Sequence, residues 1–243
     1  MSRWERLFWL FGVVALLVGM YFIVHQKQMP ETNLVFKPAQ ATEPTVYPLN
    51  NPGGVTFPVT FPGSGLTVQD MAVYEGPFSE DGSADNVTDV AAVILCNSSD
   101  QGIAYGEVTL QLEGVQYCFV FTYLPPGGRI LVPEASRKPY QEGCITDCRC
   151  VKLVREDFSL AQDTIRVTQK GMAGIMLENI TQETLQHVYL RYKLHLNQED
   201  IYIGGVTYRL EVGTLLPGQT VEVLPERFVW GYSTIVEICT VEE

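Results

Sequence analysis

An internal repeat constrains the fold of this 243-residue chain more than any other feature. Three pairs of segments match: Gly114–Tyr117 with Gly205–Tyr208, Pro126-Gly127 with Pro217-Gly218, and Leu95–Asn97 with Leu177–Asn179. The first two pairs share an offset of 91 residues and the third has an offset of 82, so the extra residues of the second copy fall around Gln198–Gly204. Because repeated motifs mark repeated structural units, the sequence predicts one fold formed twice.

Each copy has the pattern of β-strands. Apolar and polar residues alternate in Val108–Leu112, Tyr117–Phe121 and Val188–Leu194, which is the period of a strand with one buried face. Turn-forming residues separate these runs, at Asn97–Asp100, Pro125–Gly128 and Leu216–Gln219. Short strands at such spacing are typical of an all-β sandwich. We therefore predict two tandem immunoglobulin-like β-sandwich domains, over residues 66–146 and 147–243.

The second copy resembles a known family. Its Glu178-Asn179, Leu185–Tyr192 and Leu215–Thr220 are similar to the FxLYD-type sandwich of bacterial envelope proteins, in which an Asn-containing turn, an aromatic central strand and an L-x-P-G-x-x turn recur. The first copy lacks the aromatic central strand and resembles the family less. The resemblance implies a spacer or adhesion module on a cell surface, although a shared fold does not establish a shared function.

The uncharged run Leu7–Val24 is 18 residues long. As a helix it would measure about 27 Å, close to the ~30 Å hydrocarbon core of a bilayer. Arg3 and Arg6 precede the run and Lys27 follows it, a bias that keeps the N-terminus in the cytoplasm. We expect residues 1–27 to form a cytoplasmic tip and a single-pass anchor in the lipid bilayer of the cell membrane, with the rest extracytoplasmic. A cleaved signal peptide is the alternative, but it would have a shorter apolar run ending at a small-x-small site.

Residues 28–65 hold seven of the 14 prolines. Proline spaced in this way favours extended chain, so we expect a semi-rigid spacer between the membrane and the first domain. Apolar residues alternate in Val55–Phe57 and again in Val59–Phe61. The end of the spacer is therefore expected to dock onto the first domain as short strands.

Six cysteines in an exported chain are disulfide candidates. In a sandwich of this type, the strands of Cys96 and Cys118 are expected to be antiparallel neighbours with both thiols on outer faces. Glu178 and Arg209 are the equivalent positions of the second copy. We therefore predict a Cys96–Cys118 disulfide and a Glu178–Arg209 ion pair, with unpaired thiols as the alternative. The other candidates are Cys144, Cys148, Cys150 and Cys239.

No pattern of catalytic or metal-binding residues stands out. His187 and His195 would lie about 26 Å apart on a strand, too far to share a metal ion. The spacing within Cys144–Cys150 does not suit a zinc site. The acidic stretch Ser79–Asp89 could hold calcium, but its glycine is misplaced for an EF-hand, so a solvated loop is expected. Neither an activated nucleophile nor a glycine-rich phosphate loop is present. We predict no enzyme activity, metal site or cofactor.

The net charge and the glycosylation sequons bear on which classes of partner the chain can have. A formal net charge of −12 argues against nucleic acid, whose binding proteins need basic surfaces. Asn86, Asn97 and Asn179 begin glycosylation sequons, which have little meaning in a bacterial chain. The sequence favours a membrane-anchored, non-enzymatic protein with a binding, adhesion or spacer role and an unidentified protein or cell-wall partner. The alternative is a subunit of a cell-envelope or secretion assembly whose anchor helix contacts other subunits. An enzyme with an unrecognised site is the third reading.

Overall fold

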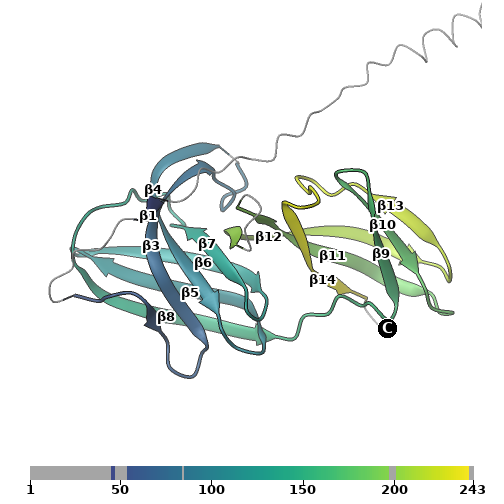
Figure 1. The fold of residues 1–243 in the computed structure, drawn as a ribbon, viewed down its shortest axis with the longest axis horizontal. Helices are drawn as coiled ribbons and strands as arrows, with labels where there is room; N and C mark the ends of the chain where they lie inside the picture. The colour runs from purple at the N-terminus through teal and green to yellow at the C-terminus, as the bar shows by residue number, and fades with distance from the viewer. Residues whose placement is uncertain (1–44, 47–53, 84, 197–200, 241–243) are drawn as a thin grey trace, which may run out of the picture. The chain divides into compact units, whose positions relative to one another are not determined.

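The computed structural model describes residues 45–46, 54–83, 85–196 and 201–240 (Figure 1). This part of the chain is all-β, as the alternating pattern predicts, and contains no helix. The strands are β1 (Thr45–Val46), β2 (Val59–Thr60), β3 (Leu66–Pro77), β4 (Asn86–Asn97), β5 (Gly102–Leu112), β6 (Val115–Leu124), β7 (Arg129–Pro133), β8 (Ile145–Glu156), β9 (Ile165–Lys170), β10 (Gly174–Asn179), β11 (Leu185–His195), β12 (Ile201–Leu215), β13 (Thr220–Val223) and β14 (Ser233–Cys239).

The predicted anchor, Leu7–Val24, and most of the predicted spacer lie outside the described residues. Within the described part, no helix is long and apolar enough to cross a membrane.

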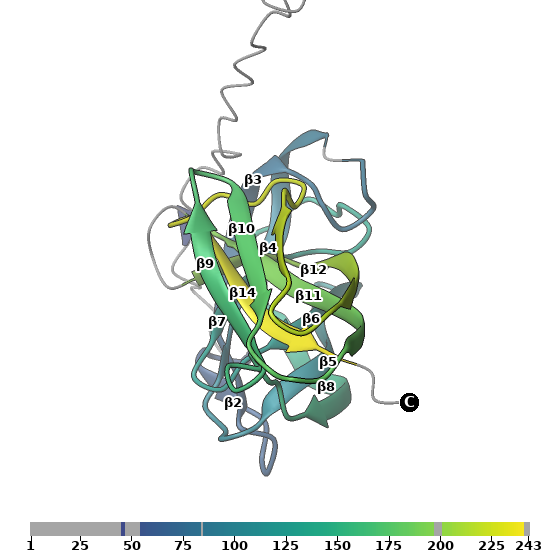
Figure 2. The same ribbon diagram turned by 90° about the vertical axis from the view of Figure 1, so that its right-hand side faces the viewer.

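The order of the strands repeats along the chain (Figures 1 and 2). In the first copy, β3, β4 and β7 form one run of paired strands, and β6, β5 and β8 form another. In the second copy, β9, β10 and β13 form one run, and β12, β11 and β14 form the other. Each copy therefore combines its first, second and fifth strands in one layer and its third, fourth and sixth in the other. The sequence repeat corresponds to this repeated pairing.

Strand β8 corrects the predicted domain boundary. It pairs with β5 from Ile145, opposite Leu112, to Glu156, opposite Gly102. The boundary expected between residues 146 and 147 therefore falls inside a strand of the first copy, and the connection to the second copy is residues 157–164. Most side chains of β8 are exposed or half-buried, so the strand carries little of the apolar alternation that would have revealed it.

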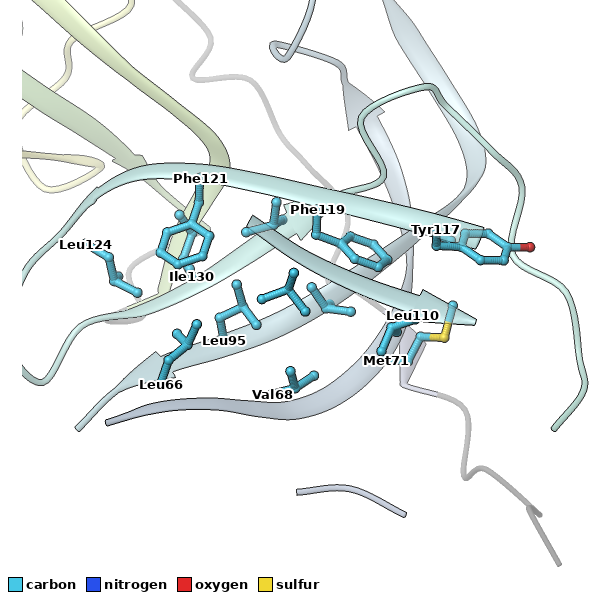
Figure 3. Packing of buried hydrophobic residues seen from close by; sticks show 14 of the residues in the cluster. Leu66, Val68, Met71, Leu95, Leu110, Tyr117, Phe119, Phe121, Leu124 and Ile130 are labelled. Carbon is cyan, nitrogen blue, oxygen red and sulfur yellow. The ribbon is translucent and has the colours of Figure 1, made fainter. Parts of the chain in front are cut away.

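The first copy buries its core between its two layers (Figure 3). Leu66 and Val68 of β3 and Leu95 of β4 pack with Phe119 and Phe121 of β6, and all five side chains are buried. Burial of these large apolar side chains is the main term that stabilises such a layered fold, at about 1.5–3 kcal/mol for each side chain. The second copy has its own cluster, which includes Ile175, Leu177, Val188, Leu190 and Tyr192.

The same buried turn occurs once in each copy. Asn97 and Asn179 are fully buried, and the side-chain amide of each donates to backbone carbonyls. These carbonyls belong to Gln101, Leu124 and Pro125 in the first copy and to Glu183 and Leu215 in the second. Each side-chain oxygen accepts from the hydroxyl and the N–H of the residue two positions later, Ser99 or Thr181. The predicted equivalence of Leu95–Asn97 and Leu177–Asn179 is confirmed.

Extra residues of the second copy join it to the first. Ile201–Ile203, at the start of β12, pair in parallel with Arg129–Leu131 of β7. Ile201 also packs with Ala92 and Leu131 in a separate buried cluster. These residues fall inside the segment around 198–204 that the offsets mark as an insertion. The insertion thus contributes a strand to the sheet of the first copy.

Candidate binding groove

A groove of about 760 Å³ opens between the two layers of the second copy. Its walls come from β9 and β14, the edge strands of the two layers, which face the viewer in Figure 2. Ile165 and Val167 line it from β9, and Ile235 and Ile238 line it from β14. Trp230 lies in the wall as well. The surface offered to a ligand is therefore mainly apolar.

Alternation along β9 positions its apolar side chains. Ile165 and Val167 share one face of the strand because side chains two residues apart point the same way. Ile165 is buried, whereas Val167 is only half-buried. Among the described residues, β9 pairs with β10 alone. The other edge of β9 thus presents backbone donors and acceptors beside an apolar wall.

Contacts on both sides fix Trp230. Its indole N–H donates to the carbonyl oxygen of Gly174 at 2.7 Å, and its ring packs edge-on against Phe228 with centroids 5.2 Å apart. A rigid, half-buried aromatic side chain of this kind offers contact area at a small entropy cost.

Few polar groups face the groove. His195 Nε2 lies 2.6 Å from the hydroxyl of Thr234, and Arg166 forms an ion pair with Glu178 at 2.7 Å. In the described part of the chain, no three His, Cys, Asp or Glu side chains gather closely enough to hold a metal ion. Together these residues supply apolar contact and hydrogen bonds, which suits binding.

The predicted Cys96–Cys118 disulfide is wrong. Cys96 lies on β4, opposite Thr67 of β3 and Arg129 of β7, whereas Cys118 lies on β6 in the other layer. The two strands are not neighbours, so the thiols are not cross-strand partners. All six cysteines are unbridged.

The predicted Glu178–Arg209 ion pair fails for the same reason. Glu178 on β10 pairs with Arg166 of β9 instead, and the Arg209 guanidinium lies 4.1 Å from the centre of the Tyr189 ring. Their strands, β10 and β12, belong to different layers.

None of the other cysteines is among the residues that line the groove. Cys148 and Cys150 lie on β8 and pack against the core of the first copy. Burial raises the pKa of the Cys148 thiol to about 12, so the reactive thiolate is scarce at neutral pH. Cys144 precedes β8, and Cys239 ends β14.

Two other sequence motifs take structural roles. In the acidic stretch Ser79–Asp89, the carboxylates of Asp81 and Asp85 form ion pairs with Arg137. In two of the sequons, the asparagine side chains are the buried amides of the repeated turn, Asn97 and Asn179, so neither is accessible to a glycan.

A cluster of titratable groups lies where the two copies meet. The ammonium group of Lys193 is fully buried and donates to the carbonyl oxygens of Val206, at 3.2 Å, and Gly205, at 3.4 Å. The carboxylate of Glu80 accepts the Gly205 N–H at 2.7 Å. Burial raises the pKa of Glu80 to about 7 and lowers that of Lys193 to about 7. Both groups therefore titrate far from their usual ranges.

Replacing Glu80 with glutamine is expected to flatten the pH dependence of stability between about pH 4.5 and 7. Folding raises the pKa of Glu80, so the folded state keeps a proton that the unfolded state releases, and stability falls as the pH rises through this window. The glutamine oxygen can still accept the Gly205 N–H. Folding lowers the pKa of Lys193 to about 7, so this group changes the stability above pH 7 and not within this window.

Urea unfolding of the full-length chain in detergent at pH 5 and pH 7 measures this effect. Between these pH values, the free energy of unfolding should fall by about 2 kcal/mol more in the wild type than in Glu80→Gln. The exposed Glu183→Gln serves as the control and should follow the wild type. Parallel profiles for the wild type and Glu80→Gln would show that Glu80 titrates normally.

The sequence did not reveal the groove. Ile165, Val167, Ile235 and Trp230 lie on segments that read only as ordinary strands or turns. A usable signal was the shorter apolar alternation before Ile165, which is limited to Phe158 and Leu160, where the first copy has four alternating apolar residues between Val55 and Phe61. No protein-family model matches this chain, and no curated protein matches it significantly.

Proposed function

We propose that this chain is a non-enzymatic binding protein, anchored in the cell membrane by Leu7–Val24 and exposed outside the cytoplasm. Its extracytoplasmic part consists of two tandem immunoglobulin-like β-sandwiches that resemble FxLYD-type domains. The second sandwich binds a partner in the groove between β9 and β14. One observation carries this proposal: the apolar groove runs beside a sheet edge that no other described strand covers.

Further features of the chain support this proposal. Grooves with mainly apolar walls and a few placed polar groups are typical of binding sites. The parallel pairing of β7 with β12, which we call the joint, fixes the second copy and its groove to the first copy. The uncharged run and the arginines before it favour an anchor whose following domains are exported.

Photo-crosslinking in intact cells tests the proposal. Benzoylphenylalanine in place of Gln162, which lines the groove, should capture a partner. The same group in place of the exposed Thr214, on the other edge of the second copy, should not. A third position, Val14, reports on the anchor. Adducts at Val14 alone would favour a subunit of an envelope assembly, and the absence of adducts at Gln162 would contradict binding in the groove.

A further inference from the structure

We propose that the groove of the second copy accepts an extended segment of a partner protein, which adds to β9 as an antiparallel strand and points large apolar side chains, at alternate positions, between the two layers. This inference rests on the proposed function and names the class of partner.

The first copy already contains such a strand, taken from its own chain. Val59 and Thr60 of β2 pair antiparallel with Val68 and Thr67 of β3. The N–H of Phe61 donates to the carbonyl oxygen of Leu66 at 3.0 Å. The expectation that the end of the spacer docks as a short strand is confirmed for these residues.

The same segment reaches the other layer. The N–H of Val55 donates to the carbonyl oxygen of Ile145, the first residue of β8, at 2.8 Å. Four side chains at alternate positions pack against the first core: Val55, Phe57, Val59 and Phe61. The residues between them, Thr56, Pro58 and Thr60, are exposed. One extended segment thus closes the edge between β3 and β8 with every second side chain.

The repeated turn places β3 and β9 in the same register. Leu66 lies opposite Asn97 in the first copy, and Ile165 lies opposite Asn179 in the second. Val68 and Val167 are therefore equivalent. Val68, which β2 covers, is fully buried, whereas Val167 is half-buried and lines the groove.

The second copy lacks the side chains that close this edge in the first. Ser64 donates its hydroxyl to the Phe61 carbonyl, and Thr164 donates its hydroxyl to the Ala161 carbonyl. This shared turn makes Ala161 the counterpart of Phe61, although the second copy has one residue fewer between the turn and its strand. A methyl group therefore stands where the first copy has a phenyl ring. Two and four residues earlier, the counterparts of Val59 and Phe57 are Ser159 and Asp157.

The chain also approaches the second copy from a different direction. Residues 157–164 lead directly from the end of β8, and the Ser159 carbonyl accepts the N–H of Ile238 at 2.8 Å. The connection therefore contacts β14 near the end of that strand, and the groove remains open between Ile165 and Trp230.

These features specify the partner. The uncovered edge of β9 offers backbone hydrogen bonds that give affinity to an added strand, and the apolar walls select alternate apolar side chains. The segment 55–61 of a second molecule is already engaged by its own first copy, so the strand comes from another protein. A lipid or a small apolar molecule would use the walls but not the edge.

A peptide of residues 54–62 with a lysine tail is the probe, because the first copy shows that this sequence fits such a groove. The protein is the full-length chain in lipid nanodiscs with Trp4→Phe and Trp9→Phe, which leave Trp230 as the only one of the three tryptophans. The fluorescence emission of Trp230 is expected to change as the peptide is added and to reach a plateau once the site is saturated. A peptide with serine in place of Val55, Phe57 and Val59 should give no change.

Two methylated peptides test strand addition. Phe61 donates to Leu66, and alternate amides along a strand face the same neighbour, so the amide of Val59 also faces the partner strand and that of Thr60 faces away. N-methylation at Val59 should weaken binding about tenfold or more. N-methylation at Thr60 adds the same group to the outer edge and should leave the affinity unchanged.

Protein variants locate the binding site. Val167→Glu places a charge in the groove wall and should weaken binding about tenfold or more. The neighbouring Thr168→Glu changes the opposite, exposed face of β9 and should bind as the wild type does. Circular dichroism melts of both variants verify that they fold. Binding that Val167→Glu does not affect would place the peptide elsewhere and overturn the inference.

The remaining outcomes separate this inference from the proposed function. Equal binding of the two methylated peptides would identify an apolar site without strand addition, so the inference would fail and the proposed function would stand. The inference would also fail, and the proposed function would stand, if the peptide did not bind while benzoylphenylalanine at position 162 captured a molecule that is not a protein. Failure of both the peptide and the adduct would overturn both proposals.

Discussion

Replacing Asn97 with alanine is expected to lower the free energy of unfolding by about 3–4 kcal/mol. The side-chain amide is fully buried and donates to the carbonyl oxygens of Gln101, Leu124 and Pro125. Its oxygen accepts the hydroxyl of Ser99 at 2.6 Å. The substitution leaves several buried polar groups without these bonds, at about 1–3 kcal/mol each when no water replaces them.

Urea unfolding of the full-length chain in detergent measures this loss. The control is Asn86→Ala, which also removes an asparagine from β4 but at an exposed position, and its effect should stay within about 0.5 kcal/mol. Asn179→Ala should resemble Asn97→Ala, because the same turn holds the second copy. A loss for Asn97→Ala as small as that for Asn86→Ala would contradict the structural role of the buried amide.

Gly205→Ala is expected to open the joint between the two copies. A Cβ at this position would lie 1.9 Å from the backbone oxygen of Val120, so the strands must shift. Thr122 and Thr207 share hydrogen bonds beside it, and Glu80 accepts the Gly205 N–H. The shift should disturb all of these contacts and cost about 2–3 kcal/mol or more.

Hydrogen exchange detected by mass spectrometry provides the measurement for this substitution. In Gly205→Ala, the peptides that cover Arg129–Leu131 and Ile201–Ile203 should exchange much faster, because their parallel pairing depends on the joint. The control Val206→Thr changes the next side chain while keeping its volume nearly constant. Unchanged exchange in Gly205→Ala would show that the joint tolerates the extra methyl group.

Local signals allowed the sequence to predict the strands and the repeat. The alternation in Tyr117–Phe121 predicted which side chains are buried, and Tyr117, Phe119 and Phe121 are indeed buried. The matching segments at Asn97 and Asn179 predicted equivalent turns because each turn is built largely from bonds within a few residues. Such information is contained in short stretches of sequence.

Pairing between distant strands was not predictable in this way. The outward position of Cys118 follows from alternation, but its neighbour depends on which layer β6 joins, and that choice is set by contacts far apart in sequence. The boundary failed because β8, with few buried side chains, carries no strong period. The groove depends on a difference between the copies, Phe61 in one and Ala161 in the other. This difference indicates an open groove only once the positions of β3 and β9 are known.

Hydrogen exchange of β3 and β9 in the full-length chain tests most directly whether the groove is the open counterpart of a closed one. The peptide that covers Leu66–Asp70 should be protected, because β2 and β4 flank it. The peptide that covers Ile165–Gln169 should exchange much faster, and addition of the peptide of residues 54–62 should slow it. Equal protection of the two strands without any added peptide would show that the edge of β9 is already covered, which would contradict the groove as a site for an added strand.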